Sequence, residues 1–226
     1  MNTLSAIINS FIFSSPTKVV NTIYGLYLGG DLFHHIWVTV YETLIAFGIG
    51  LVLSIGISIL LYMSNRLYKI LDPFLTCLNS LPKVALGPMI IIIAGANTKS
   101  IIIMAILINL IVSVVVITNG FYSTDKTRLK LMKSFKANKY QILKYLVIPS
   151  NYKTIISSFK LGISMSLIGV ITGEFLVSQA GLGYLIIYGT QVFNLDLVTS
   201  GILLLVIISY ILYKVVLYIE KILLSI

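Results

Sequence analysis

The sequence predicts an all-α integral membrane protein. Of its 226 residues, 58% are hydrophobic and only 10% are charged, and the mean hydropathy is +1.03. A chain of this size cannot hide so much apolar surface in a water-soluble core, so its apolar segments must face lipid. These segments approach the roughly 20 residues that a helix needs to cross the hydrocarbon layer.

Five apolar runs are long enough to be predicted as spanning helices. Residues 1–13 are too short for a confident sixth, so we expect five spans, or six if this run also inserts. Residues 1–37 are predicted to be a short apolar and interfacial segment, and residues 38–226 a single transmembrane domain. The N-terminal run lacks a basic region and a cleavage site, which argues against a cleaved signal peptide. The predicted spans are Val38–Met63, Leu75–Ala94, Ile101–Thr118, Ile155–Val177 and Leu195–Tyr218.

The basic residues predict the orientation of the spans, because most of them fall on one side. The opposite side has little beyond Lys18 and Lys99. The positive-inside rule places the basic side, with the C-terminus, in the cytoplasm. Topology and anionic lipid head groups explain the net charge of +9, so nucleic-acid binding is not expected. The densest basic segment, from Thr124 to Pro149, holds Lys126, Arg128, Lys130, Lys133, Lys136, Lys139 and Lys144.

Small residues at helical spacing mark two of the spans. Such a stripe lets helix backbones approach closely in a membrane, so these two spans are predicted to pack inside a bundle. The stripes are Ala46, Gly50, Ser54 and Ser58 in the first span, and Gly162, Ser166, Gly169 and Gly173 in the fourth.

The span from Leu75 to Ala94 differs from the others, because Pro82 and Pro88 interrupt it and Lys83 adds a charge. A broken, charged span is expected to face protein or water rather than lipid. Two roles for Lys83 stay open at this point. It could attract an anionic substrate, or it could form an inter-helix pair with Glu174 or Glu42.

The remaining ionisable residues in or near the spans also suggest roles. Lys160 lies near the cytoplasmic end, where snorkelling to the interface is the preferred explanation. Glu174 lies near the outer end and precedes a turn containing Gly181 and Gly183, so we predict a gate or hinge there. Glu42 is either a helix-packing partner or a pathway group. The connection 178–194, which follows Glu174, is predicted to be a re-entrant or interfacial helix at the outer mouth.

Several stretches of sequence occur in a fixed order along residues 13–222. They are Phe13-Ser14-Ser15-Pro16-Thr17, Leu71-Asp72-Pro73, the run from Leu81 to Pro88, Gln141-Ile142-Leu143, Leu146-Val147-Ile148-Pro149, Gly173-Glu174-Phe175, Gly181-Leu182-Gly183-Tyr184 and Thr199-Ser200-Gly201-Ile202. In this order the chain resembles the permease subunits of bacterial ABC importers of the nitrate, sulfonate and taurine type, a group that includes thiamine-precursor and riboflavin permeases. The resemblance implies a transmembrane domain like that of type I ABC importers.

The resemblance also implies that the loop 122–154 is a cytoplasmic coupling loop. In the family, a motif of Glu-Ala-Ala, three residues, Gly and a run ending in Pro forms short helices that dock into a groove of the ATPase. Pro149 matches the final proline, whereas Lys130, Leu131 and Met132 replace the triplet and Lys136 replaces the glycine. Similarly, Glu42 stands where the family usually shows arginine. The ATPase-coupling residues implied in this way are Lys130, Met132, Phe135, Lys136, Tyr140 and Pro149, and the predicted pathway or gate residues are Pro82, Lys83, Glu42, Glu174, Gly181 and Gly183.

Transport of this kind needs no catalytic residue, metal or cofactor in the chain. The stretch Gly95–Ser100 is not a phosphate loop, and an interfacial role for His34 and His35 is preferred over metal binding.

The resemblance implies a homodimer in the bacterial cell membrane, two ATPase subunits that bind ATP and Mg, and an extracytoplasmic solute-binding protein. Lys83 mildly favours an anionic substrate, although a vitamin precursor fits the same scaffold. The alternative is a non-transporting membrane scaffold or sensor.

Overall fold

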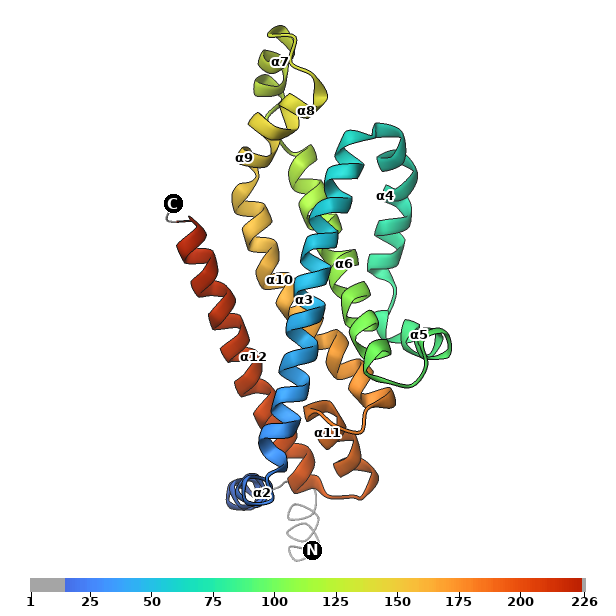
Figure 1. Ribbon diagram of the computed structural model, residues 1–226, viewed down its shortest axis with the longest axis vertical. Coiled ribbons are helices and arrows are strands. Elements are labelled where there is room, and N and C mark those ends of the chain that lie inside the picture. The colour runs from blue at the N-terminus through green and yellow to red at the C-terminus, as the bar shows by residue number, and fades with distance from the viewer. Residues whose placement is uncertain (1–14, 225–226) are drawn as a thin grey trace, which may run out of the picture.

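The computed structural model describes residues 15–224, and these residues form an elongated bundle of helices (Figure 1). Within residues 15–224, four helices are long and apolar enough to cross a membrane, and a bent pair of shorter helices would make a fifth span if counted as one. Four of the five predicted spans are therefore confirmed as continuous helices. The run 1–13, proposed as a sixth span, lies outside the described residues. The four long helices are α3 (Asp31–Met63), α6 (Thr98–Tyr122), α10 (Tyr152–Val177) and α12 (Leu195–Leu224).

Helix α6 lies between α3 and α10, and the two small-residue stripes make this close packing possible. All members of both stripes are buried. A Cβ atom added to Gly169 would lie 2.5 Å from Cα of Ala105 in α6, and one added to Gly50 would lie 2.5 Å from Nδ2 of Asn109. Backbones can approach this closely only where side chains are small, so the predicted interior position of both spans is confirmed.

The predicted span 75–94 is not a continuous helix. Helix α4 (Asn65–Ser80) runs back along the bundle, followed by a 3-10 turn, η1 (Lys83–Leu86), and the short helix α5 (Gly87–Ala94). The two helical parts are bent by 101° relative to one another. The break falls at Pro82, which has no N–H to donate and holds the preceding Leu81 in an extended conformation with ψ 144°.

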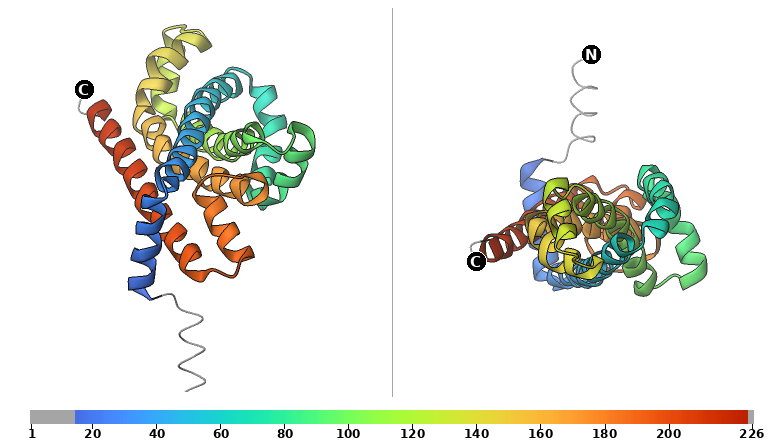
Figure 2. Two further views of the ribbon diagram at one scale, coloured as in Figure 1. Left: turned by 60° about the horizontal axis from the view of Figure 1, so that its bottom comes forward. Right: turned by 90° about the horizontal axis from the view of Figure 1, so that it is seen from above.

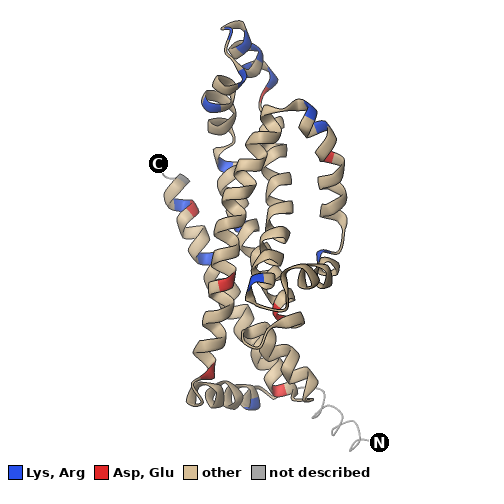
Figure 3. Cartoon of the chain, turned by 45° about the vertical axis from the view of Figure 1, so that its right-hand side comes forward, with Lys and Arg blue, Asp and Glu red and all other residues tan. Residues whose placement is uncertain are grey.

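The two ends of the bundle differ in charge (Figure 3). One end, called here the basic end, carries the short helices of the lysine-rich loop and the first turns of α4. The opposite end carries α2 (Pro16–Leu28) and α11 (Leu182–Gln191), the short helix predicted within the connection 178–194. The loop consists of α7 (Lys126–Ser134), α8 (Lys139–Ile142), a π-helical turn, η2 (Leu143–Val147), and α9 (Ile148–Ser150).

Helices α12 and α4–α5 flank the central three helices on opposite sides (Figure 2). At the opposite end, α12 packs through Leu197 and Leu204 against Leu182 and Leu185 of α11. Toward the basic end α12 diverges from α3 (Figure 1). A hollow of about 600 Å³ lies between α10 and α12.

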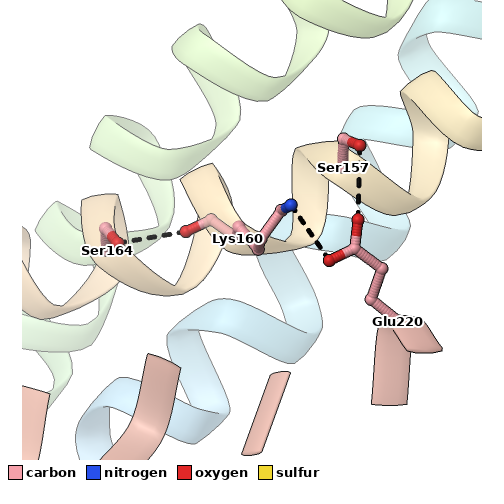
Figure 4. A network of polar contacts seen from close by, with 4 residues as sticks. All are labelled: Ser157, Lys160, Ser164 and Glu220. Carbon is pink, nitrogen blue, oxygen red and sulfur yellow. Dashed lines mark hydrogen bonds and ion pairs between the residues drawn. The ribbon is translucent and has the colours of Figure 1, made fainter. Parts of the chain in front are cut away.

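An ion pair connects α12 to α10 near the basic end (Figure 4). The Lys160 ammonium lies 3.0 Å from Oε2 of Glu220, and Ser157 donates its hydroxyl to the same carboxylate at 3.5 Å. A carboxylate on the neighbouring helix thus pairs with the Lys160 ammonium, a partner that the sequence did not indicate. Snorkelling of Lys160 to the interface stays a prediction.

Candidate functional site

The Glu174 carboxylate joins three helices at the opposite end of the bundle. Its residue is 1% exposed. Thr39 of α3 donates its hydroxyl to Oε1 at 2.6 Å, and the Gly183 N–H donates to Oε2 at 2.5 Å. The Thr39 hydroxyl oxygen accepts the Leu182 N–H at 2.8 Å. A carboxylate placed in this way satisfies free N–H groups at the start of α11 and complements the positive end of the helix.

The turn at residues 181–183 closes on Glu174 because it contains two glycines. Gly181 has φ +110°, which favours glycine, and a Cβ atom there would overlap the Glu174 carboxylate. A Cβ atom on Gly183 would lie 2.7 Å from Oε2 of Glu174. The Gly181 N–H donates to Nδ1 of His35 at 3.0 Å. The structure thus brings Glu174, Gly181 and Gly183 together, and we call this network the α11 clamp.

Glu42 lies one turn beyond Thr39 in α3 and is also 1% exposed. Neither of its carboxylate oxygens has a hydrogen-bond donor among the described residues. Glu42 is thus packed within the bundle with no described polar partner, and its role as a packing partner or a pathway group stays a prediction. Two buried acids at the same end of the bundle have opposite surroundings, since Glu174 is fully bonded and Glu42 is not.

Lys83 lies away from both acids, at the break between α4 and α5. Its ammonium donates to the Asn79 carbonyl at 3.0 Å, and Pro82 stands at the start of η1. The expected alternative of an ion pair with Glu174 or Glu42 is therefore wrong. The α4–α5 arm does contact α10, since Leu176 lies against Gly87, but no acid pairs with Lys83 among the described residues.

The lysine-rich loop folds back onto the ends of α3 and α6. Leu129 and Met132, one helical turn apart in α7, pack against a buried cluster that includes Tyr62, Phe121 and Val147. Met132 is half-buried on this side of α7, and its role in ATPase coupling stays a prediction. Helix α7 carries two apolar stripes, and the stripe through Leu129 and Met132 covers this cluster.

The other stripe of the loop faces solvent. The exposed fractions are 55% for Leu131 and 72% for Phe135, which lie four residues apart, and 61% for Tyr140 and 64% for Tyr145. The basic residues around these apolar side chains are exposed, apart from the half-buried Lys139. Only Arg128 has a described acidic partner within the loop, Asp125 at 3.7 Å, and such an exposed pair contributes little.

Two side chains fix the loop to the spans. The Lys139 ammonium donates to the Met63 carbonyl at 3.0 Å and to Oδ1 of Asn65 at 2.9 Å. The buried Asn151 amide donates to the Thr124 hydroxyl at 2.8 Å, which joins the two ends of the loop. The loop is thus a packed appendage whose movement would be transmitted to α3, α6 and α10.

Comparison with protein families gives the chain its identity. A model of the family described as "binding-protein-dependent transport system inner membrane component" matches residues 49–224. The chain belongs to this family. It is a multi-pass permease subunit of the ABC importer class, as the sequence motifs predicted.

Curated relatives of the permease are named as transport proteins. It is 28% identical over 204 residues to a probable ABC transporter permease protein of Haemophilus influenzae, which covers 90% of this chain and 82% of the relative. It is 24% identical to a putative aliphatic sulfonates transport permease protein of Bacillus subtilis, with 90% and 74% covered. A riboflavin transport system permease protein of Chloroflexus aurantiacus is 25% identical, with 95% and 80% covered.

A solved structure supports the fold of the permease. The chain aligns with a subunit of the MetNI methionine ABC transporter, solved in inward-facing conformations, with a TM-score of 0.71 and 16% identity. The alignment covers 87% of this chain and 97% of the other. The predicted transmembrane domain like that of type I ABC importers is therefore confirmed.

For three polar residues of the permease, the contacts were not predicted from the sequence. Thr39 and His35 complete the α11 clamp, and Asn151 joins the ends of the loop. His35 is 9% exposed, because the turn before α11 covers it. Of the three, only Asn151 could have been predicted to be structurally important, because it is a polar residue two positions after Pro149 at the start of a span.

Lys136 lies at the family glycine position and has φ +57°, a left-handed conformation that costs a non-glycine residue about 1–2 kcal/mol. We expect Lys136→Gly to raise the unfolding free energy by up to about 1 kcal/mol, because glycine's greater freedom when unfolded offsets part of the gain. Thermal unfolding of the purified permease checks this. Lys130→Gly, within helix α7, removes the same charge but should destabilise by about 1 kcal/mol. Equal effects would contradict the prediction.

Proposed function

We propose that two copies of this permease form the transmembrane pathway of an ABC importer for a small solute of the sulfonate, nitrate, taurine or vitamin-precursor type. An extracytoplasmic solute-binding protein delivers the solute at the end that carries α11. Two cytoplasmic ATPase subunits, which bind ATP and Mg, grip the loop at the basic end. Closure of the ATPases moves the loop, and the spans rock to open the pathway alternately to the two sides.

The loop carries this proposal. Its inward stripe packs on the ends of α3 and α6, while Leu131, Phe135 and Tyr140 stand exposed among lysines. An exposed aromatic residue with apolar neighbours is the usual anchor of a protein interface. Because the same short helices bear both stripes, a force on the outer stripe is passed directly to the spans.

Crosslinking from the loop tests the proposal. Phe135→Cys is made in a Cys77→Ser background, and Phe193→Cys, which replaces a 92% exposed phenylalanine near α11, is the matched control. We expect the thiol of the Phe135→Cys variant to crosslink to a protein that hydrolyses ATP in native membranes. The thiol of the Phe193→Cys variant should form no such crosslink.

Phe135→Ala provides a second measurement. Loss of an interface anchor costs about 2 kcal/mol, roughly thirtyfold in affinity, so the ATPase should no longer co-purify or be stimulated. A permease that binds no ATPase through this loop would instead favour the membrane scaffold or sensor. One observation favours this second function. Lysines occupy positions 130 and 136, where the family has the glutamate and glycine of its ATPase-docking motif.

A further inference from the structure

A pocket with both polar and apolar walls lies where the loop meets the ends of α3 and α6. Its volume is about 410 Å³. Five polar side chains contribute to its lining, each from a different helix: Tyr62, Asn65, Tyr122, Lys133 and Lys139. The cavity therefore brings two ammonium groups, two phenol hydroxyls and an amide to one place.

The charge in this cavity is not balanced by an acid. Lys139 donates to two neutral acceptors and lies over the Tyr62 ring at 5.8 Å, so no carboxylate among these contacts balances its charge. Lys133 has no ion-pair partner among the described residues. No carboxylate lines the cavity. Asp72 contacts Tyr68, which stacks on Tyr122 at 4.0 Å, but it is not part of the lining.

The position of the cavity indicates where an anion would come from. α3 ends at Met63 and α6 ends at Tyr122, so the cavity lies at the level where the apolar spans end and lipid head groups begin. Basic pockets between spanning helices at this level bind anionic head groups.

The geometry points to a binding site for the phosphate group of an anionic phospholipid, held by Lys133 and Lys139 with the Tyr62 hydroxyl as a further donor, since the Tyr122 hydroxyl already donates to the Leu61 carbonyl at 3.3 Å. This inference goes beyond transport and needs neither an ATPase nor a solute. A phosphate seated there would connect α7 to α8 and to the end of α3, and would hold the loop against the spans. Free inorganic phosphate has the same chemistry and must be distinguished by experiment.

The test is binding of phosphatidylglycerol and phosphatidylcholine to the detergent-purified permease, measured by native mass spectrometry. A lysine near the membrane surface contributes about fivefold to anionic-lipid affinity. We expect Lys133→Gln to weaken phosphatidylglycerol binding about fivefold and Lys133→Gln with Lys139→Gln about twenty-fivefold. The matched control, Lys126→Gln with Lys144→Gln, removes the same charge from exposed loop positions outside the cavity and should change binding less than twofold.

Three further comparisons can each overturn the proposed lipid site. Lys139→Gln also removes bonds to α3, so the single Lys133→Gln variant is informative if the double variant fails to fold. Equal loss in the control and cavity variants would show a diffuse charge effect and overturn the site. Inorganic phosphate is titrated separately. Lysine-dependent binding of inorganic phosphate without a preference for phosphatidylglycerol over phosphatidylcholine would overturn the lipid as ligand.

Discussion

Glu174→Gln is expected to destabilise the permease by about 3 kcal/mol. The carboxylate accepts hydrogen bonds from the Thr39 hydroxyl and the Gly183 N–H, and a bond to a charged group contributes about 1.5–3 kcal/mol. An amide has one acceptor oxygen, so its NH₂ group must face one of these donors. For a chain of this length the midpoint of thermal unfolding should fall by about 6–12 °C.

Glu42→Gln is the matched control, because it makes the same chemical change at an acid that is equally buried. Its carboxylate has no described donor to lose. We therefore expect little destabilisation, or a gain, since the substitution removes a potential charge from an apolar site. Thermal unfolding in detergent measures both variants under one condition.

Amide hydrogen exchange locates the effect. In Glu174→Gln the N–H groups of Leu182 and Gly183 should lose protection, because the α11 clamp holds both. In Glu42→Gln they should remain protected. Equal destabilisation by the two substitutions, or unchanged exchange at α11 in Glu174→Gln, would contradict the role assigned to the clamp.

The membrane class and the spanning helices could be predicted because they depend on local composition. The break at Pro82 was also predictable, since a proline removes a backbone donor wherever it occurs. The bend of 101° was not, because it depends on how α5 packs beside α6.

The hydrogen-bond partners of the buried polar residues were harder to predict from the sequence. Glu174 and the two glycines are close in sequence, so they were grouped as a gate or hinge, a role that stays a prediction. Thr39 is separated from Glu174 by 135 positions. A threonine in an apolar span usually bonds to its own helix, so nothing local marks it as a clamp residue.

Two further contacts were not predicted for the same reason. Local rules gave no sign of the partner of Lys160, because Glu220 is distant in sequence but only 3.0 Å away in space. The spacing of Met132 in α7 marks an apolar stripe but cannot say which stripe is covered. That depends on the buried cluster at the ends of α3 and α6.

Lys160→Met is expected to destabilise the permease by about 2 kcal/mol. Removing one partner leaves Glu220 charged and largely buried, with the Ser157 hydroxyl at 3.5 Å as its remaining donor among the described contacts. A fully buried pair would cost about 3–5 kcal/mol to break in this way, and the 30% exposure of the Lys160 side chain reduces that figure. Thermal unfolding measures the loss, and hydrogen exchange should show the last turns of α12 opening first.

The double variant Lys160→Met, Glu220→Met decides whether charge or packing is responsible. Apolar side chains of similar volume can replace a buried pair at little cost, so we expect the double variant to recover to within about 1 kcal/mol of the wild type. Lys153→Met, at an exposed position on the first turn of α10, is the control and should change stability by less than about 0.5 kcal/mol. Additive losses in the double variant would mean that the two residues act independently. The ion pair would then not be what holds α12 against α10 at the basic end.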